Sequence, residues 1–113
     1  MNKKELRKLL NEHKKWLKGK GGKQLNLIHK DLSHLDLAGE DLSFANIIRS
    51  NLYGVDLTSA NLYNSNLSNS NLGDSCLRNV NLSRANVNGV NFIGVDFTNS
   101  YLFGMKVNKH SRF

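Results

Sequence analysis

Few side chains in this sequence could carry out chemistry, and their spacing does not bring them together. Cys76 is the single thiol, and no histidine lies near it in the chain to activate it as a nucleophile. His29 and His34 supply too few ligands for a metal site. Five carboxylates recur at multiples of five residues: Asp31, Asp36, Asp41, Asp56 and Asp96. This spacing indicates a structural repeat and not an acid–base pair, so we expect no enzyme, no cofactor and no metal.

The repeat that spaces these carboxylates is five residues long. Large apolar residues stand at every fifth position from Leu27 to Val107, seventeen times without a break. The residue before each is Asn or Asp in fourteen of the seventeen repeats, and the exceptions are Cys76, Tyr101 and Lys106. Small side chains usually stand two residues before the central residue, and turn-forming residues often stand two residues after it. The period is therefore continuous from about residue 24 to residue 109.

A period of five fits neither a straight strand nor an α-helix. On a strand, an odd period would send successive leucines to opposite faces, and on a helix five residues advance the side chain by about 140°. The pattern makes sense only if every repeat contains its own bend. The central residue and the residue two before it then point inward, and the intervening Asn or Asp points outward. Repeated bends in one direction wind the chain into a coil with a leucine core.

Units such as Ala60-Asn61-Leu62-Tyr63-Asn64 and Ala85-Asn86-Val87-Asn88-Gly89 resemble the A(D/N)LXX unit of the pentapeptide-repeat family. The resemblance covers residues 25–109. It implies an all-β solenoid, a right-handed quadrilateral β-helix with four repeats per coil and about four coils. Similar proteins often pair through their C-terminal ends, and some are quinolone-resistance factors that bind DNA gyrase and resemble duplex DNA in shape and charge.

The first residues of the chain predict a single amphipathic α-helix over 2–18, with Asn2 as its N-cap. Its apolar side chains share one arc of the helical wheel: Leu6, Leu9, Leu10, His13, Trp16 and Leu17. A stacked solenoid exposes its core at each end, so we expect this arc to cap the N-terminal opening. The alternative is a free helix that lies on an anionic membrane or on nucleic acid.

The charge of the chain is concentrated in the same segment. Residues 1–23 hold nine Lys or Arg and two Glu, and therefore the whole net charge of +7, whereas residues 24–113 are neutral. The helix carries a basic face opposite its apolar arc: Lys4, Arg7, Lys8, Lys15 and Lys18. Such a face is either a solvated surface or a binding surface for nucleic acid or another anionic surface. We divide the chain into a capping helix with a Gly/Lys linker (1–23), the repeat region (24–109) and a short tail (110–113).

Two positions expected to face inward carry charges, Lys30 and Glu40. A charge inside a solenoid core is costly unless it is paired. Both residues belong to the first coil, so we expect them to reach the rim of the N-terminal opening or to pair with each other.

The C-terminal coil has no helix to cover it and is rich in aromatic residues. We predict a homodimer in which two copies of this end meet on a two-fold axis. Its interface residues would be Phe92, Phe97, Tyr101, Leu102, Phe103, Met105 and Val107. In the competing arrangement, Asn108–Phe113 folds back and Phe113 plugs the opening of a monomer.

These features favour a non-enzymatic structural or protein-interaction module whose target the sequence does not name. The alternative is nucleic-acid or anionic-surface binding through the basic helix. A DNA-mimicking gyrase ligand is less favoured, because mimicry needs an acidic rod and this body is neutral. The longest apolar run near the N-terminus is Leu9-Leu10, so we expect no signal peptide and no membrane insertion. One cysteine cannot form an internal disulfide, and a cytoplasmic location is expected.

Overall fold

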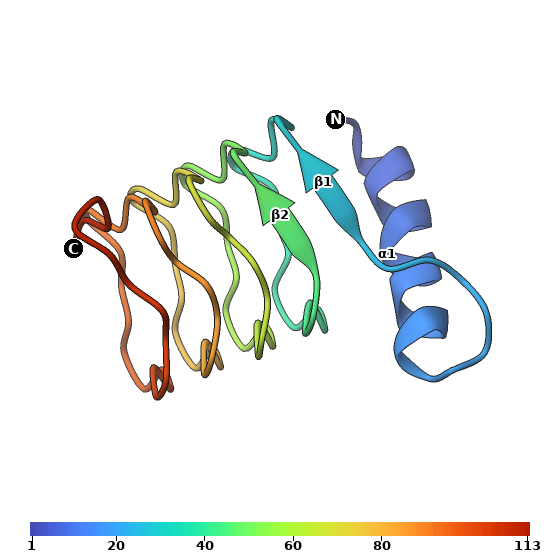
Figure 1. The fold of residues 1–113 in the computed structure, drawn as a ribbon. Coiled ribbons are helices and arrows are strands. Elements are labelled where there is room, and N and C mark those ends of the chain that lie inside the picture. The colour runs from blue at the N-terminus through green and yellow to red at the C-terminus, as the bar shows by residue number, and fades with distance from the viewer.

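The computed structural model describes residues 1–113 as one helix followed by a stack of coils. Helix α1 spans Lys3–Leu17, and two short strands follow, β1 (Asn26–Ile28) and β2 (Asn46–Ile48). The strands are parallel and in register, with Leu27 opposite Ile47. Figure 1 shows α1 lying across one end of the stack and the C-terminus at the other end.

The coils are held together by a ladder of parallel bridges between residues twenty apart. The ladder begins beyond β1 with Asp31 opposite Asn51 and keeps this spacing as far as Asn86 opposite Lys106. Twenty residues are four repeats, so four repeats make one coil. The N-terminal helix and the coiled repeat region are therefore both present as expected.

Each coil turns at a residue in the left-handed backbone conformation. Every fifth residue from His29 to Gly104 has a positive φ, sixteen in all. Only five of these are glycines, and the others include Phe44 (φ 62°) and Arg49 (φ 52°). A non-glycine residue in this region costs about 1–3 kcal/mol. The hydrogen-bonded ladder on both sides of each corner therefore imposes the turn.

The preference for Asn or Asp before the central residue has a local cause. Twelve of these side chains accept a hydrogen bond through Oδ1 from the N–H group two residues later, as Asn61 does from Tyr63 at 3.0 Å. Such bonds satisfy a backbone donor at the corner of the coil. The two Asn residues without this bond, Asn26 and Asn46, lie in β1 and β2.

The core is a column of central residues with smaller side chains beside it. The central residues from Leu27 to Phe92 are buried and belong to one apolar cluster. Most serines at the small inward positions bond to the backbone: Ser70 Oγ donates to the carbonyl of Ile47 at 2.9 Å and accepts from the N–H of Ser50 at 3.0 Å. A hydroxyl can therefore face this core without losing its hydrogen bonds.

The ladder extends past the expected end of the repeat region at residue 109. Asn91 pairs with Arg112, a spacing of 21 that leaves one extra residue in the last turn. Ser111 Oγ donates to the carbonyl of Val87 at 2.8 Å, much as Ser70 Oγ donates to the carbonyl of Ile47 two coils earlier. Phe113 then stacks on Phe92 with ring centroids 5.1 Å apart. The last three residues thus form a displaced, incomplete repeat and not a free tail.

Candidate functional site

The N-terminal end of the stack is covered by α1. The helix begins where the side chain of Asn2 accepts a hydrogen bond from the N–H of Glu5 at 2.8 Å. Leu6 and Leu10 are buried in the same apolar cluster as the coil leucines, and Leu9 packs against it. Leu17 is half-buried. These side chains of the predicted arc therefore face the first coil.

His13 connects the middle of α1 to the first coil through hydrogen bonds. Its side chain is fully buried, and the N–H of Leu25 donates to Nδ1 at 2.8 Å. Nδ1 is therefore unprotonated, and Nε2–H donates to the carbonyl of Ser43 at 3.0 Å. Trp16 stacks on His13 with centroids 5.5 Å apart, but 38% of it is exposed. Trp16 thus lies at the edge of the cap, because the imidazole occupies the position nearer the coil.

The negative charge of Glu40 is also paired with cations of the helix. Its carboxylate lies 2.6 Å from Arg7 and 4.0 Å from Lys14, and its side chain is about 10% exposed. Of the two arrangements expected for Lys30 and Glu40, the structure contradicts the mutual pair, because Glu40 pairs with helix cations and Lys30 is exposed. Arg7 stays beside Lys4 and Lys8, with half of its side chain exposed, but it also pairs with Glu40, because a nearly buried carboxylate needs a cation beside it.

The loop after α1 returns closely to the helix. The N–H of Lys23 donates to the carbonyl of Glu12 at 3.2 Å. Gly22 has a φ of 74°, and a Cβ there would lie 2.2 Å from the same carbonyl oxygen. Only glycine permits this approach.

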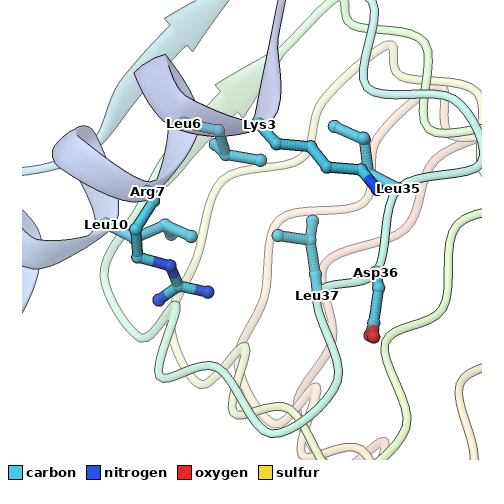
Figure 2. A pocket seen from close by; sticks show the side chains of 7 residues that line it. All are labelled: Lys3, Leu6, Arg7, Leu10, Leu35, Asp36 and Leu37. Carbon is cyan, nitrogen blue, oxygen red and sulfur yellow. The ribbon is translucent and has the colours of Figure 1, made fainter.

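A cavity of about 330 Å³ lies between α1 and the first coil (Figure 2). Its lining consists of four leucines and three charged residues: Leu6, Leu10, Leu35, Leu37, Lys3, Arg7 and Asp36. Figure 2 shows Leu6 and Leu10 coming from the helix and Leu37 from the coil. Most of this lining already serves the contact between helix and coil.

The remaining members of the predicted basic face are open to solvent, although Lys18 lines a hollow beside Asp41 of the first coil. Lys4, Lys8, Lys15 and Lys18 are all exposed. Only Lys15 has an acidic partner, Glu12, at 3.6 Å within the same helix. We call these four residues the lysine stripe.

The C-terminal end has much less cover. Phe92 is buried, whereas Phe97 and Met105 are half-buried. The other predicted interface residues are exposed, by 82% for Phe103 and by smaller fractions for Tyr101, Val107 and Leu102. Phe113 covers Phe92 but is itself 64% exposed. An aromatic surface therefore remains open at this end.

The residues whose side chains could carry out chemistry do not lie close to one another. Half-buried Cys76 lies in the ladder between Asp56 and Asp96, with its Sγ atom 3.2 Å from Thr58 Oγ1. His34 packs edge-on against Tyr53. No group of three or more His, Cys, Asp or Glu side chains is arranged to hold a metal ion.

Two polar pairs on the outer surface were not predicted from the sequence. The Tyr53 hydroxyl donates to Asp74 at 2.6 Å, which raises the pKa of Tyr53. Hydrogen bonds from the Thr98 hydroxyl and from Arg78 lower the pKa of Asp96 to about 2. The paired residues are 21 and 18 positions apart. A search for complementary side chains about one coil apart could have found both pairs.

The family model for pentapeptide repeats matches the chain in eight copies, over residues 26–64, 36–74 and 75–102. The chain belongs to the pentapeptide-repeat family. No curated protein matches it significantly. None of its helices is both long enough and apolar enough to cross a membrane.

Solved structures with the same repeat are similar to this chain. A pentapeptide repeat protein, Rfr23, from the cyanobacterium Cyanothece 51142 is 31% identical with a TM-score of 0.73, over 74% of this chain and 56% of the other. One from Nostoc Pcc 7120 is 23% identical with a TM-score of 0.61, over 87% of this chain and 93% of the other. One from the Arabidopsis thaliana thylakoid lumen is 23% identical with a TM-score of 0.51, over 72% of this chain and 60% of the other. This chain thus spans little more than half the length of the Cyanothece protein, and the matches imply a right-handed β-helix.

Proposed function

We propose that this chain is a non-enzymatic interaction module that forms a homodimer through its C-terminal coil. The observation that carries the proposal is the exposed apolar surface of Tyr101, Phe103 and Val107 at that end. The finer geometry we propose for this right-handed β-helix is a coil with four sides. The role we propose is display of the outer faces to a protein partner, and the compartment we propose is the cytoplasm.

A second copy of the chain suits the C-terminal surface for two reasons. Exposed apolar residues gathered at one place favour association. The last coil also has backbone groups with no further coil to pair with, and such edges invite another chain. A two-fold axis would bring identical surfaces together and close the assembly at two copies.

The competing monomer is favoured by one contact, the stacking of Phe113 on Phe92. That contact covers Phe92 but leaves Phe103 exposed by 82%. The incomplete last repeat is therefore a partial lid, and the aromatic surface around it supports dimer formation. We place Phe113 within the interface, where its own exposed ring would pack against the second copy.

Light scattering on the purified chain tests the dimer. We expect about twice the monomer mass of 12.7 kDa at tens of micromolar. Phe103→Glu should split the dimer, whereas Lys4→Glu at the opposite end should leave it intact. A clean monomer of the unmodified chain at that concentration would overturn the proposal.

Mimicry of DNA towards gyrase is a weaker candidate. Residues 24–113 carry seven Lys or Arg and seven Asp or Glu, so the repeat region has no net negative charge. A surface that competes with duplex DNA for a basic site needs such a charge. The charge of this chain lies instead in its first 23 residues and has the opposite sign.

A further inference from the structure

We propose that the lysine stripe on α1 binds the phosphate backbone of a nucleic-acid duplex without reading its sequence. This inference goes beyond self-association, because it concerns the opposite end of the molecule and a different class of partner. Four observations carry it: the spacing of the stripe, the burial of the apolar arc, the lack of acidic partners and the position of the cations along the helix.

The stripe is straight and of suitable length. Lys4, Lys8, Asn11, Lys15 and Lys18 follow one another at intervals of four and three residues, so they lie on one face of α1. The fourteen residue steps from Lys4 to the C-cap residue Lys18 span about 21 Å, which matches about six phosphates of one strand of a duplex. The amide of Asn11 offers a further donor in the gap between Lys8 and Lys15.

The docking of α1 favours a nucleic acid over a membrane. A helix that lies in a lipid interface buries its apolar face among acyl chains. Here Leu6, Leu10 and His13 are buried against the first coil and are not available to lipid. Leu9 and Leu17 are half-buried, and only Trp16 of the arc is exposed, by 38%. The helix therefore offers lipid little apolar surface beside its charged face, which suits the duplex backbone.

The charges of the stripe are not used to hold the fold together. Among the nine cations of residues 1–23, Arg7 and Lys14 lie beside Glu40, and Lys15 lies beside Glu12. The other six have no carboxylate within 4.0 Å: Lys3, Lys4, Lys8, Lys18, Lys20 and Lys23. The Lys15–Glu12 pair is exposed and therefore weak, so a phosphate can displace the carboxylate.

The placement of cations along α1 opposes helix stability at one end. Lys15 and Lys18 at the C-terminal end interact favourably with the helix dipole. Lys4 stands in the first turn, where a cation is unfavourable. Helix stabilisation explains Lys15 and Lys18 but not Lys4, whereas an anionic ligand along the stripe accounts for all three.

Fluorescence anisotropy with a labelled mixed-sequence DNA duplex of about 20 base pairs, two turns of helix, tests the proposal. Four phosphate contacts predict a slope of log K against log salt near −3.6, or about a hundredfold loss of affinity between about 50 and 200 mM salt. Replacing all four lysines of the stripe with Gln should remove most of the binding and flatten this slope. A second duplex of unrelated sequence should bind equally well.

The matched control removes four exposed cations of the repeat region: Lys30→Gln, Arg49→Gln, Arg84→Gln and Lys106→Gln. This variant has the same net charge as the stripe variant and should keep most of the affinity. Circular dichroism confirms that both variants fold, and light scattering reports dimer formation separately. Equal losses in the two variants, no duplex binding at low salt, or binding to phosphatidylserine vesicles but not to the duplex would each overturn the proposal.

Discussion

At its N-terminal end the stack of coils is covered by the fifteen residues of α1, whereas at its C-terminal end the cover is an incomplete repeat that ends at Phe113. Both ends face the same physical problem, since a solenoid exposes its core where the stacking stops. The first end solves it with a helix of the same chain. The second leaves aromatic surface open, which suits association with another copy.

The two ends also differ in the kind of contact they use. The helix is held by apolar side chains and by two polar anchors, His13 with its two backbone partners and Glu40 with Arg7. At the C-terminal end, Phe92 contacts two rings, Phe97 at a tilt and Phe113 in a stack, and Ser111 adds a hydrogen bond to the carbonyl of Val87. Buried polar anchors demand one geometry, because every unmet bond is costly. The position of the helix should therefore be more uniquely defined than the arrangement of the side chains at the C-terminal end.

The largest expected effect comes from truncating a leucine at each end. Leu10 is 2% exposed and Leu102 is 36% exposed. Leu10→Ala should cost about 2–5 kcal/mol of unfolding free energy, and Leu102→Ala about half of that, at concentrations too low for dimer formation. Urea denaturation followed by circular dichroism measures both. Equal costs would break the contrast between a covered end and an open one.

The next effect tests the polar anchor. His13→Leu leaves the N–H of Leu25 and the carbonyl of Ser43 without partners, and should cost about 2–3 kcal/mol. His34→Ala, at an exposed corner, should change the unfolding free energy by no more than about 0.5 kcal/mol. If the two substitutions had similar effects, His13 would not be an anchor of the helix.

A smaller effect is expected at the C-terminal end. Phe113→Ala removes the stacking on Phe92 and should destabilise the monomer by about 1 kcal/mol. Phe103→Ala should leave monomer stability nearly unchanged, because its ring is 82% exposed. The same pair of variants, measured in dilute solution by thermal unfolding, separates the lid from the open surface. A larger loss for Phe103→Ala than for Phe113→Ala would reverse the assignment.

The smallest effect compares one aspartate in the first coil with one in the last. Hydroxyl hydrogen bonds lower the pKa of Asp31 (from Ser33) and of Asp96 (from Thr98), and Arg78 lowers that of Asp96 further, to about 2. Arg78→Gln should raise the pKa of Asp96 and leave that of Asp31 unchanged, and Ser33→Ala should do the reverse. Carboxyl chemical shifts in an NMR titration measure both values.

The sign of the linked pH effect follows from these directions. Both folded-state pKa values lie below the unfolded value of about 3.8. The stability that the two carboxylates contribute is therefore fully present above pH 4, and it is lost as the pH falls from about 4 towards 2. Arg78→Gln should raise the lower limit of the pH range over which the contribution of Asp96 to stability is lost. If acid unfolding of this variant matched that of the unmodified chain, the result would argue against the Arg78–Asp96 pair.

The hydrogen bonds of individual core serines could not be predicted, because the five-residue pattern is the same at all equivalent positions. Ser65 and Ser70 occupy the same inward position in successive repeats. Ser70 Oγ bonds to the backbone, whereas Ser65 Oγ is buried without a partner. The difference depends on how each hydroxyl meets the coil beside it, and this relation does not appear within five residues of sequence.

The sequence by itself determined the coil, the buried column from Leu27 to Phe92 and the amphipathic helix, because side-chain direction over a few residues follows from local backbone geometry. Only the tertiary structure decided that Arg7 pairs with Glu40 and that one extra residue brings Phe113 onto Phe92. These contacts join residues whose separation along the chain reflects the stacking of coils and the placement of the helix. A buried charge without a partner and an exposed apolar surface each cost free energy, and this cost favours some pairings over others. The cost arises only once the coils are assembled, so it cannot be read from the sequence alone.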